Sequence, residues 1–174
     1  MFSCHEDVVY PGHGVARIQR IVEKSIGGVT TVFYELAFLN KDMVILVPTE
    51  CAEQVGLRCL SSLDYVRKAF DIISKPRIER RRFGPATGNW NKRNKGYQLK
   101  LRTGSLCELS EIYRDLRLVE EHKPLSFGEK HLLMQTEELL AEEISLVKQV
   151  DHEAIIEQLR ALYSCGKKSV EREG

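Results

Sequence analysis

The five histidines are the first candidates for chemistry, because imidazole titrates near neutral pH and binds metals. They are scattered singly along the chain, at His5, His13, His122, His131 and His152. The sequence has no glycine-rich phosphate-binding loop and no Gly-x-Ser-x-Gly or His-Glu-x-x-His segment. Cys4, His5 and His13 lack a fourth ligand at a spacing typical of zinc sites. We therefore expect no catalytic residue, no metal and no cofactor, and a protein that is not an enzyme.

Three pairs of adjacent glutamates are the next candidates, at residues 120–121, 137–138 and 142–143. General acid and base catalysis needs two carboxylates that converge on one pocket and differ in pKa. Neighbouring residues on a helix point in different directions and do not converge in this way. We interpret the pairs as parts of solvated helix faces.

A block of positive charge between residues 75 and 102 is the strongest feature of the sequence. It holds ten cations and a single acidic residue, Glu79, a net charge of +9 inside a chain of net charge +1. The cations are Lys75, Arg77, Arg80, Arg81, Arg82, Lys92, Arg93, Lys95, Lys100 and Arg102. Because attraction for a polyanion depends on the local field, the block predicts a nucleic-acid site in an otherwise acidic protein.

The single tryptophan, Trp90, lies inside this block at the expected start of a helix, followed by Lys92, Arg93 and Lys95. An aromatic residue placed there can enter a DNA groove or stack on a base while the cations contact phosphates. The positive end of the helix dipole would add attraction for phosphate. The alternative is that Trp90 fills the protein core at the start of the helix, and the residue types alone leave both alternatives open.

The sequence pattern also predicts the secondary structure that positions the candidate residues. The first 59 residues have the pattern of short antiparallel strands. Residues 8–10, 15–22, 29–39 and 43–47 are rich in β-branched and aromatic residues, and turn residues separate them. Gly27 and Gly28 predict a tight hairpin. Several short strands at close spacing are typical of a small Tudor-like or SH3-like β-barrel, which we expect for residues 1–59.

After residue 60 the apolar spacing becomes helical, which predicts a second domain over residues 60–165 and a polar tail over 166–174. Expected helices cover residues 63–75, 89–102, 106–120, 126–147 and 151–164. Ser126 and Glu129 form a capping-box pattern at the start of the fourth helix. The fold class is therefore α+β with two domains, a small barrel followed by a compact bundle of about five helices.

The chain has no run of about 20 apolar residues, and its N-terminus is polar and acidic. The five cysteines are odd in number and contain no Cys-x-x-Cys pair, which favours reduced, mostly buried thiols. We expect a cytoplasmic protein without membrane contact, and a monomer, since no heptad seam demands a dimer.

Four segments together resemble the CarD/CdnL regulators of bacterial RNA polymerase. They are DVVYPGHGVA at residues 7–16, VP at 47–48 with AEQVGLR at 52–58, NW at 89–90 with its basic neighbours, and LSFGEK at 125–130. The ordered set spans nearly the whole chain. The resemblance implies an N-terminal barrel on the polymerase β subunit, similar to the polymerase-interaction domain of the transcription-repair coupling factor.

The resemblance also implies that the helical domain contacts promoter DNA at the upstream edge of the melted region and stabilises the open complex. Trp90 would be the minor-groove wedge, with Arg93 and Lys95 as cationic supports. Lys92 and the run Arg80, Arg81 and Arg82 complete the expected DNA contacts. Few base-specific contacts are expected, because the cations suit phosphates.

On the polymerase-facing side, Lys24 occupies a position where the family places a basic contact. A second position, often held by arginine in the family, is Leu46 here. We expect Lys24, Leu46, Val47 and Pro48 to contact the polymerase, at a nucleoid-associated location. Two alternatives remain: a polymerase-independent nucleic-acid-binding module, and a protein-binding adaptor in which Trp90 belongs to the core.

Overall fold

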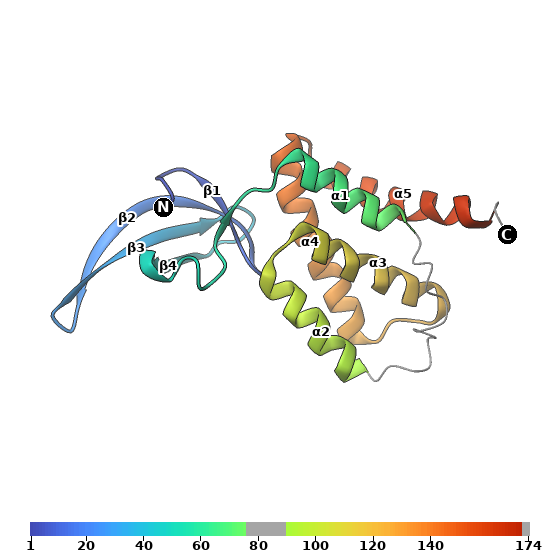
Figure 1. Ribbon diagram of the computed structural model, residues 1–174, viewed down its shortest axis with the longest axis horizontal. Coiled ribbons are helices and arrows are strands. Elements are labelled where there is room, and N and C mark those ends of the chain that lie inside the picture. The colour runs from blue at the N-terminus through green and yellow to red at the C-terminus, as the bar shows by residue number, and fades with distance from the viewer. Residues whose placement is uncertain (76–89, 172–174) are drawn as a thin grey trace. The chain divides into compact units, whose positions relative to one another are not determined.

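The computed structural model describes residues 1–75 and 90–171, without the side chains of residues 26, 91, 92 and 165–171 (Figure 1). Within it the chain divides into two compact units, Met1–Leu60 and Ser61–Gly174. Each unit has a hydrophobic core of its own. The units are therefore described one at a time.

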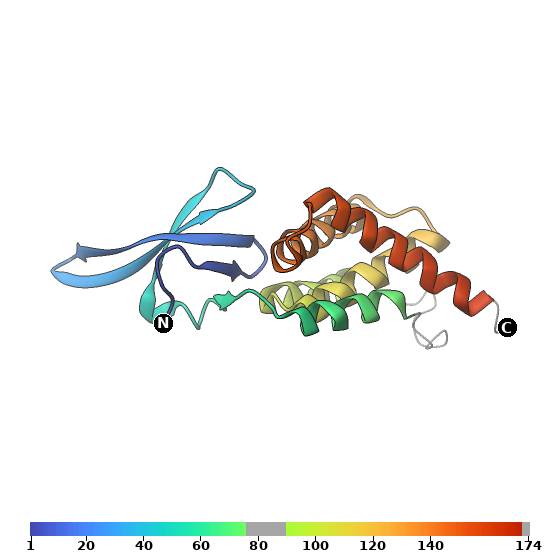
Figure 2. The ribbon, with the colours of Figure 1, turned by 90° about the horizontal axis from the view of Figure 1, so that it is seen from above.

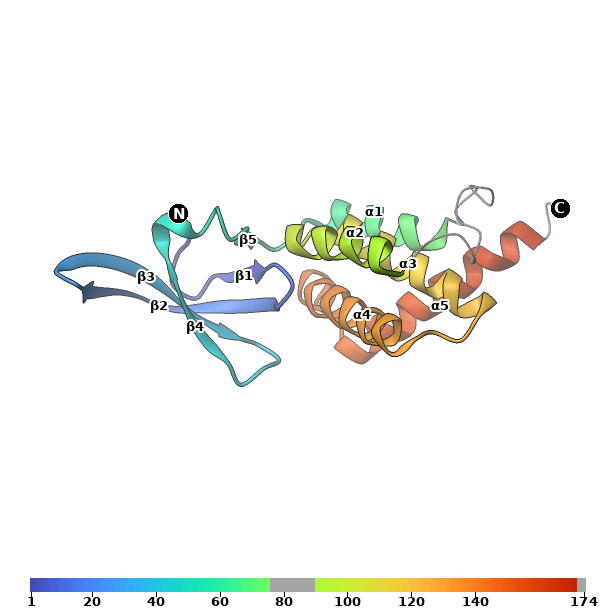
Figure 3. The ribbon, with the colours of Figure 1, turned by 90° about the horizontal axis from the view of Figure 1, so that it is seen from below.

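The first unit is a five-stranded antiparallel sheet in the order β4-β3-β2-β1-β5. Its strands are β1 Asp7–Tyr10, β2 Gly14–Ile26, β3 Val29–Phe38, β4 Val44–Pro48 and β5 Arg58–Cys59. A short 3-10 helix, η1 Thr49–Cys51, follows β4. The long strands β2 and β3 form a curved ribbon (Figures 2 and 3).

The expected hairpin between β2 and β3 is present. Gly27 and Gly28 both have positive φ, 63° and 83°, as a type I′ turn requires. A side chain on either residue would strain this backbone, so the Gly-Gly pair sets the register of the ribbon. The core beneath it includes Ile18, Leu36 and Tyr34.

The second unit contains, in its described residues, five α-helices. They are α1 Leu63–Ser74, α2 Trp90–Thr103, α3 Leu106–His122, α4 Phe127–Lys148 and α5 His152–Glu171. Helix α3 packs against α1, α2 and α4, and α5 packs against α1 and α4 (Figure 1). None of the described helices is long and apolar enough to cross a membrane.

The helix ends follow the expected signals. Ser126 and Glu129 form the predicted capping box: the Ser126 side chain accepts a hydrogen bond from the Glu129 amide, and the Glu129 carboxylate accepts one from the Ser126 amide. At the other end of α4, Gln149 adopts the left-handed conformation, with a φ of 54°. The predicted two-domain α+β fold is confirmed.

Two expectations about burial are wrong. The thiols of Cys4 and Cys59 are exposed, and no disulfide joins the four cysteines whose side chains are described. The expectation of solvated helix faces holds for Glu120 and Glu121, which are exposed, and is wrong for the other two pairs, in which Glu137, Glu142 and Glu143 are buried. Partners explain two of these acids, since Glu137 binds arginines and Glu143 accepts a hydrogen bond from the Ser61 amide at 2.8 Å.

Candidate functional site

Trp90 begins α2 and lies partly buried against the hydrophobic core of the helical unit. Its indole covers Gly128 in the first turn of α4. A Cβ atom placed on Gly128 would lie 3.2 Å from Cζ2 of Trp90 and 3.6 Å from Nε1. Because Gly128 has no side chain, the indole of Trp90 can pack directly against it. Trp90 is neither a fully buried core residue nor a fully exposed one.

Arg93, one helical turn after Trp90, does not extend freely into solvent. Its Nη2 donates a hydrogen bond to Oε1 of Glu129 at 2.9 Å, and its guanidinium carbon lies 6.0 Å from the centre of the Trp90 ring. Glu129 itself is 1% exposed. The ion pair therefore links the first turns of α2 and α4 beside the indole.

The Glu129 carboxylate has several partners besides Arg93. It accepts hydrogen bonds from the amide and the hydroxyl of Ser126, at 2.9 and 2.8 Å, and Lys123 Nζ lies 3.5 Å away. Burial alone would raise the pKa of Glu129, but the Ser126 hydrogen bonds and the charges of Lys123 and Arg93 hold it below the ordinary value. The carboxylate is therefore held in its charged form.

The remaining expected DNA contacts divide into two groups. Lys95 is exposed on α2. Lys130, which is not among the contacts expected from the sequence, is exposed in the first turn of α4. The side chain of Lys92 and all of Arg80, Arg81 and Arg82 lie outside the described residues. The structure therefore places Trp90, Arg93 and Lys95 on one helix, with Arg93 committed to an internal partner.

A second charged cluster surrounds Glu137 on α4. Its carboxylate accepts hydrogen bonds from Arg117 at 2.9 Å, from Arg160 at 2.7 Å and from the Tyr113 hydroxyl at 3.1 Å. Burial raises the pKa of Tyr113 to about 12. Each of these side chains thus has a partner of opposite charge or a hydrogen-bond partner. This arrangement is typical of an ion-pair network that joins helices.

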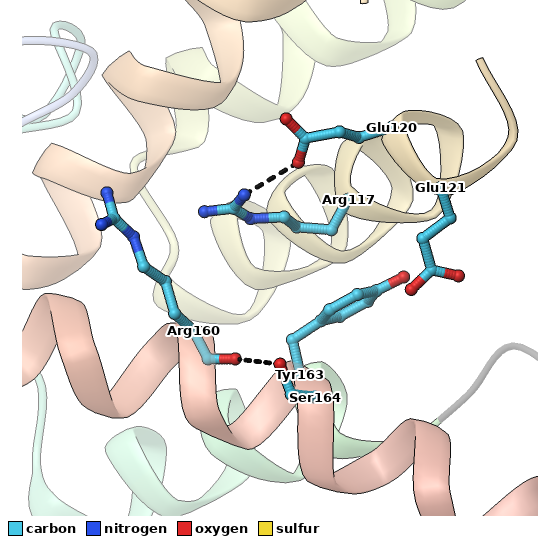
Figure 4. A pocket seen from close by; sticks show the side chains of 6 residues that line it. All are labelled: Arg117, Glu120, Glu121, Arg160, Tyr163 and Ser164. Atoms are coloured by element: carbon cyan, nitrogen blue, oxygen red, sulfur yellow. Dashed lines mark hydrogen bonds and ion pairs between the residues drawn. The ribbon is translucent and has the colours of Figure 1, made fainter. Parts of the chain in front are cut away.

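A pocket of about 270 Å³ lies next to this cluster. Its lining residues are Arg117, Glu120, Glu121, Arg160, Tyr163 and Ser164 (Figure 4). Arg117 donates a hydrogen bond to Glu120 at 2.8 Å, and the Ser164 hydroxyl donates one to the Arg160 carbonyl at 3.0 Å. The volume is below the roughly 300 Å³ from which ligand pockets start, and the charges are paired internally.

Among the described residues, no group of three or more His, Cys, Asp or Glu is placed to hold a metal ion.

The four expected polymerase contacts lie on the sheet of the first unit, on both of its faces. Strand register places Leu46 opposite Glu35 and Glu35 opposite Arg20. Residues paired directly across strands share a face, and alternate residues along a strand do as well. Lys24 and Pro48 therefore lie on the Leu46 face. Val47 points the other way into the core and is buried, so it supports the sheet.

Comparison with known proteins agrees with this architecture. The family described as CarD-like/TRCF RID domain matches residues 2–60, and the family described as CarD, C-terminal domain matches residues 70–160. A relative from Bacillus subtilis (strain 168), YdeB, whose name describes it as a candidate transcription factor, is 26% identical over 155 residues. That alignment covers 89% of this chain and 97% of YdeB.

The sheet unit and the helical unit together define a two-domain transcription factor of the kind that interacts with RNA polymerase. The chain belongs to the CarD family. The expected family resemblance is thereby confirmed. The roles of individual site residues stay predictions.

The contacts of Gly128 and Glu129 with α2 could not be predicted from the sequence. Glu129 forms a recognisable capping box with Ser126, which accounts locally for its residue type, and nothing in the neighbouring sequence indicates why residue 128 is a glycine. Their contacts with α2 join positions 36 or more residues apart, and no local spacing encodes such a contact. The buried, ion-paired state of Glu129 becomes visible only once the two helices are packed.

Proposed function

We propose that this protein binds the β subunit of bacterial RNA polymerase through its N-terminal sheet and stabilises the promoter open complex through its helical unit. The observation that carries the proposal is the partly exposed indole of Trp90, seated on Gly128 at the start of the cationic helix α2. A partly exposed aromatic side chain that packs on its own unit beside cations is suited to act as a wedge at a DNA base step.

The proposed mechanism is a difference in affinity between two promoter states. Inserting an apolar wedge into duplex DNA costs a few kcal/mol of base stacking, and this cost falls where the duplex is already opening. Trp90 would therefore bind the open promoter better than the closed one. A factor shifts such an equilibrium by its differential affinity, and about 1.4 kcal/mol corresponds to tenfold.

Attachment to the polymerase supports this mechanism. Anchoring one domain raises the effective concentration of the other near its site, so a weak DNA contact suffices. The cations suit phosphates more than base edges, and we therefore propose action at many promoters with little sequence preference.

The sheet offers a suitable surface for the polymerase. Strand β4 lies at the edge of the sheet and pairs only with β3 among the described strands. Its residues Val44 and Leu46 expose apolar side chains on the same face as Lys24. An edge strand with alternate exposed side chains is suited to β-strand addition, in which backbone hydrogen bonds supply affinity.

The decisive experiment measures open-promoter lifetime on purified bacterial RNA polymerase with wild-type protein and with Trp90→Ala and Trp90→Phe. Circular dichroism first establishes that each variant is folded. We expect a longer lifetime with wild type, no extension with Trp90→Ala and a partial one with Trp90→Phe. No effect of wild type on several promoters would overturn open-complex stabilisation.

Salt dependence separates this proposal from a protein-binding adaptor. If about five cations meet phosphates, the logarithm of the DNA-binding constant should fall with the logarithm of salt concentration with a slope of about −4 to −5. A slope near zero would favour the adaptor. Retention of the protein on polymerase free of nucleic acid would reject a polymerase-independent DNA-binding module.

A further inference from the structure

Phe127 is the most exposed aromatic residue described, with 89% of its surface accessible. It occupies the first position of α4 and does not belong to the hydrophobic core of its unit. Burying a phenylalanine side chain stabilises a fold, and the described part of this unit leaves that of Phe127 exposed. Single exposed apolar residues are common, so the neighbourhood of Phe127 decides its meaning.

The neighbour of Phe127 in sequence is Gly128, on which the indole of Trp90 is seated. The two aromatic side chains therefore belong to one corner of the helical unit, where the first turns of α2 and α4 meet. Trp90 is held there by contact with Gly128 and by the ion pair of Arg93 with Glu129 beside it. Phe127 makes no comparable contact with the described residues and extends into solvent.

Among the described residues, the exposed charged side chains nearest in sequence to Trp90 and Phe127 are cations. Lys95 and Lys130 are exposed, and Lys130 follows Phe127 by three residues, one helical turn. Helix α2 contains no acidic residue, and the acid in the first turn of α4 is Glu129, which is buried and paired with Arg93 and Lys123. The corner thus exposes aromatic rings and cations while its carboxylate is neutralised. That combination fits nucleic acid, because cations meet phosphates and rings stack on bases.

We propose that Phe127 is a second aromatic contact to DNA, stacking on an unpaired or unstacked base next to the step contacted by Trp90. This inference rests on the proposed function and extends it from one wedge residue to a pair. Two rings at one junction would favour DNA that is already separating over intact duplex, since only exposed base faces accept a second ring.

A matched control lies on the same helix. Met134 follows Phe127 by seven residues, two helical turns, and is 70% exposed. It is separated from Gly128 by more than a turn and therefore lies away from Trp90. If the exposed apolar face of α4 served a protein partner instead, Met134 would belong to that surface as much as Phe127 does.

The experiment measures binding of the full chain to two fluorescein-labelled DNAs by anisotropy, one a complete duplex and the other a forked duplex with unpaired arms. The variants are Phe127→Ala, Phe127→Trp, Met134→Ala and Trp90→Ala, with thermal unfolding as the check on folding. We expect Phe127→Ala to weaken binding to the fork on the order of tenfold and to the duplex by less. Phe127→Trp should retain binding, and Met134→Ala should match wild type.

The outcomes are distinguishable. Fork binding by Phe127→Ala equal to that of wild type, with weakened binding by Trp90→Ala, overturns the inference and leaves the proposed function intact. Equal losses for Phe127→Ala and Met134→Ala also overturn it, in favour of a surface that spans α4. Failure of the wild-type protein to bind either DNA overturns the inference, whereas the proposed function, in which the polymerase anchors a weak DNA contact, is tested separately by the open-promoter lifetime.

Discussion

The guanidinium of Arg93 and the buried carboxylate of Glu129 form a 2.9 Å ion pair between residues 36 positions apart in sequence. The pair fixes the first turn of α2 against the first turn of α4, beside the indole of Trp90. A cation expected to face DNA phosphates thus has a structural role in the free protein. The effect of removing this ion pair on the stability of the helical unit should therefore be measurable without DNA.

Arg93→Ala should lower the free energy of unfolding of the helical unit by about 1–3 kcal/mol, because a buried charged acceptor loses a partner. Urea unfolding followed by Trp90 fluorescence measures this change, since the chain has a single tryptophan. Lys95→Ala, which removes an exposed cation from the same helix, should leave stability unchanged. Equal stability of the two variants would show that Lys123 and Ser126 are sufficient partners for Glu129.

Gly128→Ala should displace the indole of Trp90, because the new Cβ would lie 3.2 Å from Cζ2. We expect a shifted tryptophan emission maximum and weaker DNA binding in the folded variant. Gly96→Ala is the matched control, because its added Cβ would meet no atom within 4 Å beyond its chain neighbours and the backbone of its own helix. Gly96→Ala should stabilise α2 by about 1 kcal/mol through helix propensity alone. An unchanged tryptophan emission maximum in Gly128→Ala would contradict the packing of the Trp90 indole on Gly128.

Acid should destabilise the helical unit through Glu137. Burial alone would raise the pKa of this carboxyl, but hydrogen bonds and charges from Arg160 and Arg117 hold it below 4.5, the ordinary value. The unfolded chain therefore takes up the proton first as pH falls. Stability from this group is complete well above pH 4.5 and is lost as pH falls from there through the folded-state pKa.

Melting temperatures between pH 7 and pH 3, followed by Trp90 fluorescence, test this dependence. Glu137→Gln should be less stable than wild type at neutral pH and should show a shallower loss in acid. Glu153→Gln, at an exposed position on α5, should retain the wild-type profile. Parallel profiles for wild type and Glu137→Gln would assign acid sensitivity to other carboxyls.

Leu46→Glu should weaken retention on RNA polymerase, because it places a charge on the exposed face of the edge strand β4. Leu46 is 38% exposed. The control is Ile21→Glu: Ile21 is 42% exposed, and its register partner Tyr34 places it on the opposite face. Co-elution with the polymerase in size-exclusion chromatography measures both variants. An equal loss for Ile21→Glu would indicate a contact that does not depend on the β4 face.

Much of this architecture was readable from the sequence because its signals are local. The Gly27-Gly28 hairpin, the Ser126 capping box and the apolar spacing of the helices depend on residues within a few positions of one another. The family resemblance rests on short ordered segments in the same way. These signals defined a sheet unit, a helical unit and the basic block around Trp90.

Tertiary structure decided what the local signals leave open. The residue types alone could not choose between core and surface for Trp90, and packing on Gly128 gave it an intermediate position. The acid pairs looked like solvated helix faces, yet Glu137 and Glu143 are buried, because Arg117, Arg160 and the Ser61 amide reach them from other parts of the unit. Burial of a charge depends on partners distant in sequence, and spacing along one helix carries no information about them.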